Sequence, residues 1–133
     1  MSFCNDAGSI TTRSAEEVFE NHLRLWVAGS LEEDLRHNYA EDVVLLTVNS
    51  NARGHDAIRM SARRIQEQLP DARYEFLAKQ IDGPWVLLIW RGWSSRFKAA
   101  EGADSLDIRN GKIRFQSIHY RLEDPWAPSP SAS

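Results

Sequence analysis

The hydrophobic period of the chain changes at Pro70, and this change limits the folds open to it. Before Pro70, apolar residues recur every three or four positions; Ile58, Ile65 and Leu69, for example, share one helical face. From Tyr74 onward, apolar and polar residues alternate, which is the pattern of strands. Proline lacks the amide hydrogen that a continuing helix needs. The sequence therefore predicts helices in its first half and an antiparallel sheet in its second.

Local signals mark the ends of these elements. Ser14 and Glu17 have the spacing of a capping box, so a helix begins at Ser14, and Gly29 is suited to end it. A second capping-box pattern starts at Ser30. The expected order is helices at 14–28 and 31–39, a strand at 43–48, a loop at 49–54, a helix at 56–69, strands at 74–81 and 85–97, a small-residue connection at 99–103, and strands at 104–108 and 112–122. This order predicts an α+β domain with helices on one face of a curved sheet.

Composition indicates one ordinary globular domain. The chain has 133 residues and a formal net charge of -3. We expect one domain at 14–123, a flexible N-terminus at 1–13 and a disordered tail at 124–133. The acidic balance predicts no nucleic-acid partner and no membrane partner. Because residues 1–13 lack the pattern of a signal peptide, a cytoplasmic location is expected.

Three motifs and the order of elements resemble the nuclear transport factor 2-like superfamily, which includes SnoaL-like polyketide cyclases and ketosteroid isomerases. The motifs are WVAGSLE at 26–32, YAEDVVL at 39–45 and DIRNGKI at 107–113, and residues 53–58 fit the usual start of the third helix. The resemblance implies a cone-like fold with three N-terminal helices packed on a curved, mostly antiparallel sheet. It also implies a ligand pocket and a homodimer formed through the outer face of the sheet.

His22 is the first candidate for chemistry. At about 100° per residue it lies in the apolar stripe of the first helix, between Val18 and Trp26. An inward imidazole needs a hydrogen-bond partner. It is either a core histidine bonded to the backbone, or a donor or general acid lining a pocket.

Asp104 is the second candidate, because it shares strand parity with Leu106 and Ile108. A carboxylic acid held neutral in an apolar site can donate a hydrogen bond to a developing oxyanion. The alternative is an aspartate at the rim of the sheet, solvated or paired with an arginine.

The last hairpin decides which residues share the face of Asp104. With a two-residue turn at 110–111, Asp104 would lie with Ser117 and His119. With a three-residue loop and a bulge, it would lie with Gln116, Ile118 and Tyr120. The resemblance favours the second arrangement.

The resemblance also suggests roles for individual residues. The tyrosine of the ketosteroid isomerases on the first helix corresponds to His22, their oxyanion-binding aspartate to Asp104 and their general base to Thr47. Threonine cannot act as that base near neutral pH, so steroid isomerisation by the same mechanism is not expected. The predicted catalytic residues are His22, Asp104 and Tyr120, and the predicted pocket residues are Phe19, Trp26, Tyr39, Trp90, Gln116 and Ile118.

Two hypotheses follow from these residues. The first is an acid/base isomerase, cyclase or dehydratase acting on a small apolar or aromatic carbonyl compound. The second is a dimeric module that binds a ligand or a protein without turnover. No cofactor and no metal are predicted, because the four histidines lack metal-ligand spacing and no glycine-rich phosphate loop is found.

Overall fold

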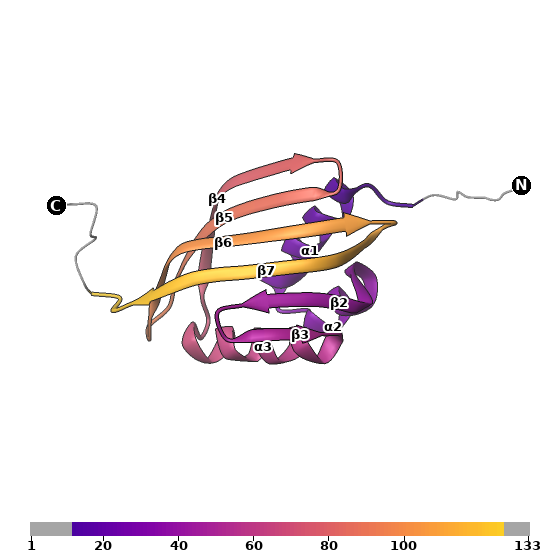
Figure 1. Ribbon diagram of the computed structural model, residues 1–133. Coiled ribbons are helices and arrows are strands. Elements are labelled where there is room, and N and C mark those ends of the chain that lie inside the picture. The colour runs from indigo at the N-terminus through magenta and orange to yellow at the C-terminus, as the bar shows by residue number, and fades with distance from the viewer. Residues whose placement is uncertain (1–11, 127–133) are drawn as a thin grey trace, which may run out of the picture.

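The computed structural model describes residues 12–126 and shows helices packed against one face of a curved sheet (Figure 1). The sheet has six strands in the order β3-β2-β7-β6-β5-β4, and only the β2–β7 pair is parallel. The elements are α1 (Ala15–Ala28), α2 (Leu31–Asn38), β2 (Tyr39–Thr47), β3 (Ser50–Arg53), α3 (His55–Gln68), β4 (Arg73–Asp82), β5 (Trp85–Trp93), β6 (Lys98–Arg109) and β7 (Lys112–Glu123). The α+β class and the helical first half agree with the prediction.

Several predicted boundaries were wrong. The loop expected at 49–54 contains strand β3, and the connection expected at 99–103 belongs to β6. The expected strand 85–97 ends at Trp93, and β2 begins at Tyr39 rather than at residue 43. Short polar or small-residue segments carry little strand signal of their own. Residues 99–103 are held in the sheet because they pair with strands on both sides.

The ends of the first two helices differ in their capping. Ser14 and Glu17 form both halves of the predicted capping box, and Gly29 ends α1 in the left-handed conformation at φ 74°. Ser30 makes no side-chain capping bond at the start of α2, so the second predicted capping box is absent. The predicted flexible ends lie largely outside the described residues. Arg13, which is described, donates hydrogen bonds to Asn38, to the carbonyl of His37 and to that of Gly111.

The β6–β7 hairpin combines features of both predicted arrangements. Arg109 pairs with Lys112, so Asn110 and Gly111 form a two-residue turn, with φ 53° and 76°. The register then shifts by one residue, because Asp107 pairs with Phe115 whereas Ile108 pairs with Ile113. The extra residue, Arg114, is a β-bulge that reverses the facing of everything beyond it.

The bulge brings the predicted set of residues to one face despite the two-residue turn. Asp104 lies opposite Ile118, and Leu106 lies opposite Gln116. These four side chains therefore share the face that meets the helices. The three-residue loop was wrong, and the arrangement of Asp104 with Gln116 and Ile118 was right.

A second irregularity shapes the middle of the sheet. Three residues of β6, from Ala100 to Ala103, span the same distance as two of β7, and Glu101 adopts φ 57°. At Gly102 a Cβ atom would lie 2.4 Å from the indole ring of Trp90. Only glycine lets β6 pass this close to that ring. The strand bends here and forms the concave side of the sheet.

The core lies between the helices and this concave side. Its fully buried side chains include Phe19, Leu35, Leu45, Leu106 and Ile113. Within residues 12–126, no helix is both long and apolar enough to cross a membrane.

Candidate functional site

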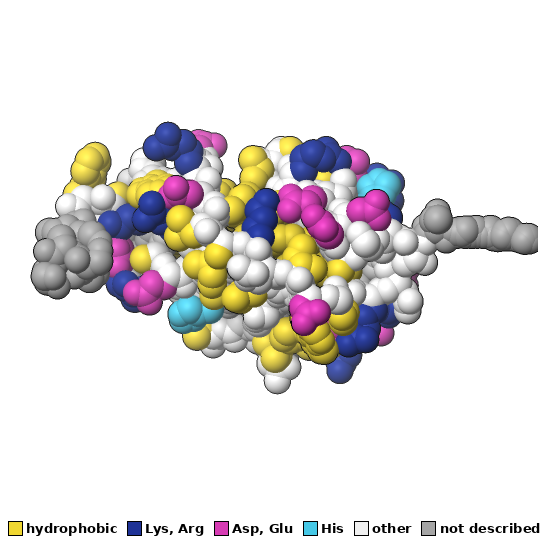
Figure 2. All heavy atoms as spheres, turned by 90° about the horizontal axis from the view of Figure 1, so that it is seen from above, with side chains coloured by type: hydrophobic (Ala, Val, Ile, Leu, Met, Phe, Trp, Pro, Cys, Tyr) yellow, Lys and Arg dark blue, Asp and Glu magenta, His cyan; other side chains and the backbone are white. Residues whose placement is uncertain are grey.

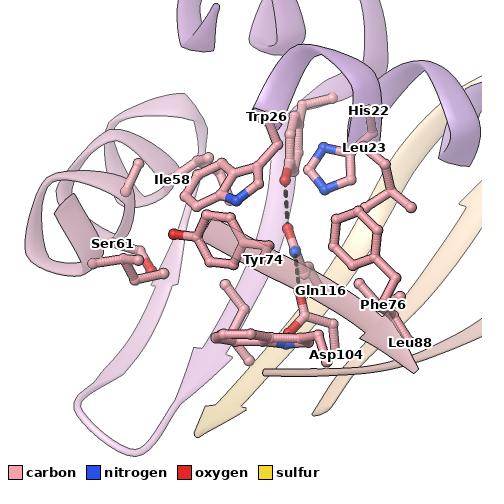
Figure 3. Close-up of a pocket in the computed structure, with 15 residues that line it drawn as sticks. His22, Leu23, Trp26, Ile58, Ser61, Tyr74, Phe76, Leu88, Asp104 and Gln116 are labelled. Atoms are coloured by element: carbon pink, nitrogen blue, oxygen red, sulfur yellow. Dashed lines mark hydrogen bonds between the residues drawn. The ribbon is translucent and has the colours of Figure 1, made fainter. Parts of the chain in front are cut away.

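A partly enclosed cavity of about 50 Å³ lies between α1, α3 and the concave face of the sheet (Figure 3). Its wall is largely apolar and aromatic, with polar groups from α1, β2, β6 and β7. The lining residues are His22, Leu23, Trp26, Tyr39, Ile58, Ser61, Ala62, Ile65, Tyr74, Phe76, Leu88, Trp90, Asp104, Gln116 and Ile118. An apolar cavity with a few convergent polar groups is the usual form of a small-molecule site.

Asp104 is the carboxyl group that lines this cavity, and it is buried. Its Oδ1 accepts a hydrogen bond of 2.9 Å from Nε1 of Trp90, and its Oδ2 accepts one of 3.0 Å from Nε2 of Gln116. Gln116 can donate in this direction because its Oε1 accepts the hydroxyl of Tyr39 at 2.5 Å (Figure 3). The hydrogen bond from Tyr39 thus orients the Gln116 amide toward Asp104, and Trp90 supplies a second donor, an arrangement suited to a carboxylate.

Burial raises the pKa of the Asp104 carboxyl to about 6, although the bonds from Trp90 and Gln116 and the nearby His22 ring lower it. Burial also raises the pKa of both phenols that line the cavity. Burial raises the pKa of Tyr74 to about 12 and that of Tyr39 well above its usual value. Both phenols therefore stay neutral at physiological pH. Asp104, by contrast, can gain or lose a proton at a pH close to neutral.

His22 is paired with an acidic residue that sequence reasoning missed. Its Nδ1 lies 2.8 Å from Oδ2 of Asp34, and both side chains are buried. The other oxygen of Asp34 accepts a hydrogen bond of 2.8 Å from Asn38. Because a carboxylate can only accept, Nδ1 of His22 carries the proton, which leaves Nε2 as the nitrogen available to a ligand. Of the two environments predicted for His22, the core histidine bonded to the backbone is therefore not observed, and the ring lines the cavity.

Asp34 gave little signal because it lies in an acidic helix start, EEDL, that indicates an exposed face. Only the packing of α2 against α1 turns this residue inward. Tyr74 and Phe76 were also missed. Their alternation along β4 could have suggested them, since both carry large side chains on the same face of one strand.

The cavity contains seven of the nine predicted site residues. His22, Asp104, Trp26, Tyr39, Trp90, Gln116 and Ile118 all line it. Phe19 does not: its side chain is fully buried in the core, three residues before His22 on α1, and it does not reach the cavity wall.

Tyr120 also lies outside this cavity. Its hydroxyl donates to the side chain of Gln68 on α3, and its ring lies 5.6 Å from that of Trp90. Tyr120 lies opposite the point where β6 gains its extra residue, and its hydroxyl reaches α3 rather than the cavity. The predicted convergence of Tyr120 with His22 and Asp104 on one cavity is not observed.

This fold and this cavity define a class of proteins. The sequence model of the SnoaL-like domain matches residues 19–116, and the chain belongs to that family. No curated protein matches the chain.

Solved structures share the nuclear transport factor 2-like fold. A protein from Kribbella flavida DSM 17836 superposes with a TM-score of 0.69 at 20% identity, covering 84% of this chain and 88% of the other. A candidate ketosteroid isomerase from the same organism has a TM-score of 0.66 at 16% identity, covering 87% and 82%. The candidate hydroxylase AclR from Streptomyces galilaeus has a TM-score of 0.65 at 11% identity, covering 80% and 88%. At these identities the likeness shows the fold alone.

Proposed function

We propose that this chain catalyses proton transfer on a small, largely apolar carbonyl compound held in the cavity. The observation that carries the proposal is the buried carboxyl of Asp104, which lines the cavity and has a pKa near 6. A general acid or base works best when its pKa lies close to the operating pH. Isomerisation, cyclisation and dehydration of carbonyl compounds all begin with such a proton transfer.

In this proposal Asp104 is the base and His22 is the acid. Both oxygens of Asp104 accept hydrogen bonds, which supports a carboxylate that takes a proton from the carbon beside the carbonyl. Nε2 of His22 is the proposed donor to the carbonyl oxygen, and Asp34 bonds Nδ1 and fixes the orientation of the ring. Asp104 thus takes the place of Thr47 as the base, and the neutral, donating aspartate expected from the resemblance is not part of this proposal.

The size and lining of the cavity limit the ligand. A volume of about 50 Å³ is smaller than the roughly 150 Å³ that accepts benzene in an engineered protein cavity. A ring-sized ligand therefore requires the half-buried rings of Trp26 and Tyr74 to move, and these lie 6.1 Å apart on one side of the cavity. The aromatic wall suits a flat, apolar molecule with one polar group.

The test is deuterium exchange at the carbon beside the carbonyl of β-tetralone, followed by proton NMR in heavy water. The protein is expected to accelerate exchange, with a rate that rises as pH rises through about 6. Asp104→Asn should lower the rate by roughly 10²-fold or more, as expected for loss of a general base. Asp107→Asn is the matched control, because Asp107 is on the same strand but pairs with Arg109 outside the cavity. Equal exchange by wild type and Asp104→Asn would rule the proposal out.

A homodimer formed through the outer face of the sheet is part of the same proposal. Trp85 is 57% exposed, and Leu87, two residues later on β5, is exposed on the same face. Viewed from above, hydrophobic side chains gather between charged groups of both signs (Figure 2). A hollow of about 480 Å³ beside Ile81, Trp85 and Leu87 would receive side chains from a second copy. Exposed apolar patches of this kind support association.

A further inference from the structure

A second chamber of about 150 Å³ adjoins the first cavity on the side of β2 and the end of β7. Ser61 and Ile118 line both spaces, so they form the boundary between them. The walls differ in character. The second chamber is lined mainly by polar side chains: Thr47, Asn49, Ser61, Arg64, Gln68, His119 and Tyr120, together with Val48, Ile118 and Leu122.

Arg64 is the cation of this second chamber. It is half-buried on α3, and within residues 12–126 it takes part in no ion pair. Its one side-chain hydrogen bond is a long one of 3.5 Å to the hydroxyl of Ser50. Arg59, one and a half turns earlier on α3, instead has two carboxylate partners, Glu32 and Asp56. A partly buried guanidinium with so little compensation is expected to attract an anion.

Neutral donors lie beside this guanidinium. The Thr47 hydroxyl accepts a hydrogen bond from the amide of Asn49, which leaves its own proton to donate. Burial raises the pKa of Tyr120, and the Arg64 charge acts against that increase, so the guanidinium reaches this part of the chamber electrostatically. The only carboxyl group of the first cavity, Asp104, lies on the far side of Ile118 and does not line the second chamber. An anion in the second chamber would thus not contact Asp104 directly, although the Asp104 charge reaches Tyr120 and helps to raise its pKa.

We propose that the second chamber binds a carboxylate on the same molecule whose apolar part occupies the first cavity, with Arg64 as the residue that selects for it. The ligand class is then an apolar or aromatic carbonyl compound that carries a carboxylic acid. The planar guanidinium matches a carboxylate in two parallel hydrogen bonds, which a neutral amide cannot reproduce. That the ligand is a carbonyl compound rests on the proposed function. The preference of the second chamber for a carboxylate over a neutral group does not depend on turnover.

The test compares two probes that differ in one group: hydrocinnamate, which carries a carboxylate, and hydrocinnamamide, its neutral amide. Binding of each is measured by titration with detection of the ligand signals by NMR, at low ionic strength because salt screens the attraction. Wild type should bind the carboxylate at least roughly 10-fold more tightly than the amide, as expected for a charge-assisted pair. Arg64→Gln should bind the two probes equally, and Arg64→Lys should restore part of the difference.

Arg63→Gln is the matched control, because Arg63 neighbours Arg64 on α3 but is exposed to solvent and does not line the chamber. It should keep the full preference. Equal binding of the two probes by wild type, a preference that survives in Arg64→Gln, or binding of neither probe at millimolar concentration would each overturn the proposal. Loss of preference in Arg64→Gln with β-tetralone exchange unchanged supports the carboxylate site separately from the catalytic role of Asp104. Loss of exchange in Asp104→Asn with the preference for the carboxylate intact would support the catalytic role of Asp104 separately from the carboxylate site.

Discussion

The indole nitrogen of Trp90 donates a hydrogen bond of 2.9 Å to Oδ1 of Asp104, and both side chains are buried. Trp90 can hold this position only because Gly102 leaves room for its ring. An extra residue in one strand, a glycine and a tryptophan together place one carboxyl group in an apolar cavity. The proposed chemistry depends on that placement.

The first prediction concerns stability as a function of pH. The folded-state pKa of Asp104 is raised from 3.8 to about 6, so the folded protein binds a proton more tightly than the unfolded chain does. Stability from this group is therefore fully present below pH 3.8, is lost as pH rises through about 6, and amounts to about 3 kcal/mol. The free energy of unfolding, measured with urea between these pH values, should decrease more steeply with rising pH for wild type than for Asp104→Asn. Parallel curves for the two proteins would contradict the raised pKa.

The second prediction concerns Gly102. A methyl group at this position would meet the indole of Trp90, so Gly102→Ala is expected to destabilise the fold by about 2 kcal/mol through overpacking. It should also displace Trp90 from Asp104 and change the near-ultraviolet circular dichroism. Gly29→Ala is the comparison: it strains a left-handed residue whose Cβ would meet no other atom within 4 Å and which does not line the cavity, so it should leave Trp90 in place and that spectrum unchanged. An unchanged spectrum and stability in Gly102→Ala would mean that the ring is not held there.

The third prediction concerns the pair formed by His22 and Asp34. Asp34→Ala removes the acceptor for both His22 and Asn38 in a buried setting, and should lower the free energy of unfolding by about 3 kcal/mol. His22→Gln should fold and bind β-tetralone but exchange its protons at least roughly 10²-fold more slowly. A His22→Gln protein with the wild-type exchange rate would assign this histidine to structure alone.

The fourth prediction concerns the outer face of the sheet. Replacing the exposed Trp85 by serine should convert the proposed dimer into a monomer, since it removes the largest apolar side chain of that surface. Light scattering coupled to size-exclusion chromatography gives the mass of both proteins. Val27→Ser is the control, because Val27 is 61% exposed on α1 rather than on the sheet. A monomeric wild type would contradict the proposal.

Much of the fold could be predicted from the sequence because the helical and strand periods are strong and separated by Pro70. The caps at Ser14 and Gly29 are also local, so they could be read from neighbouring residues, whereas the length of the turn after Arg109 stayed open between two and three residues. Strand β3 could not be predicted in this way, because the four residues SNAR form a strand only through pairing with β2.

The site could be predicted only in part for the same reason. His22 and Asp104 were found because each lies in an apolar pattern of its own element. The partner of His22, Asp34, comes from another helix, and only tertiary packing reveals it. The bulge at Arg114, which turns Gln116 toward Asp104, has no clear local sequence signal. Tyr120 was misplaced because strand parity alone does not account for the curvature of the sheet.

The most direct measurement is a titration of Asp104 by NMR of protein labelled with ¹³C at its aspartate carboxyl groups, with Asp104→Asn used to assign the resonance. Asp104 is expected to titrate near pH 6, well above the ordinary aspartate value of 3.8, and a ligand that fills the cavity should perturb this transition. A transition at the ordinary value, insensitive to ligand, would contradict the central claim that Asp104 is a buried proton-transfer group.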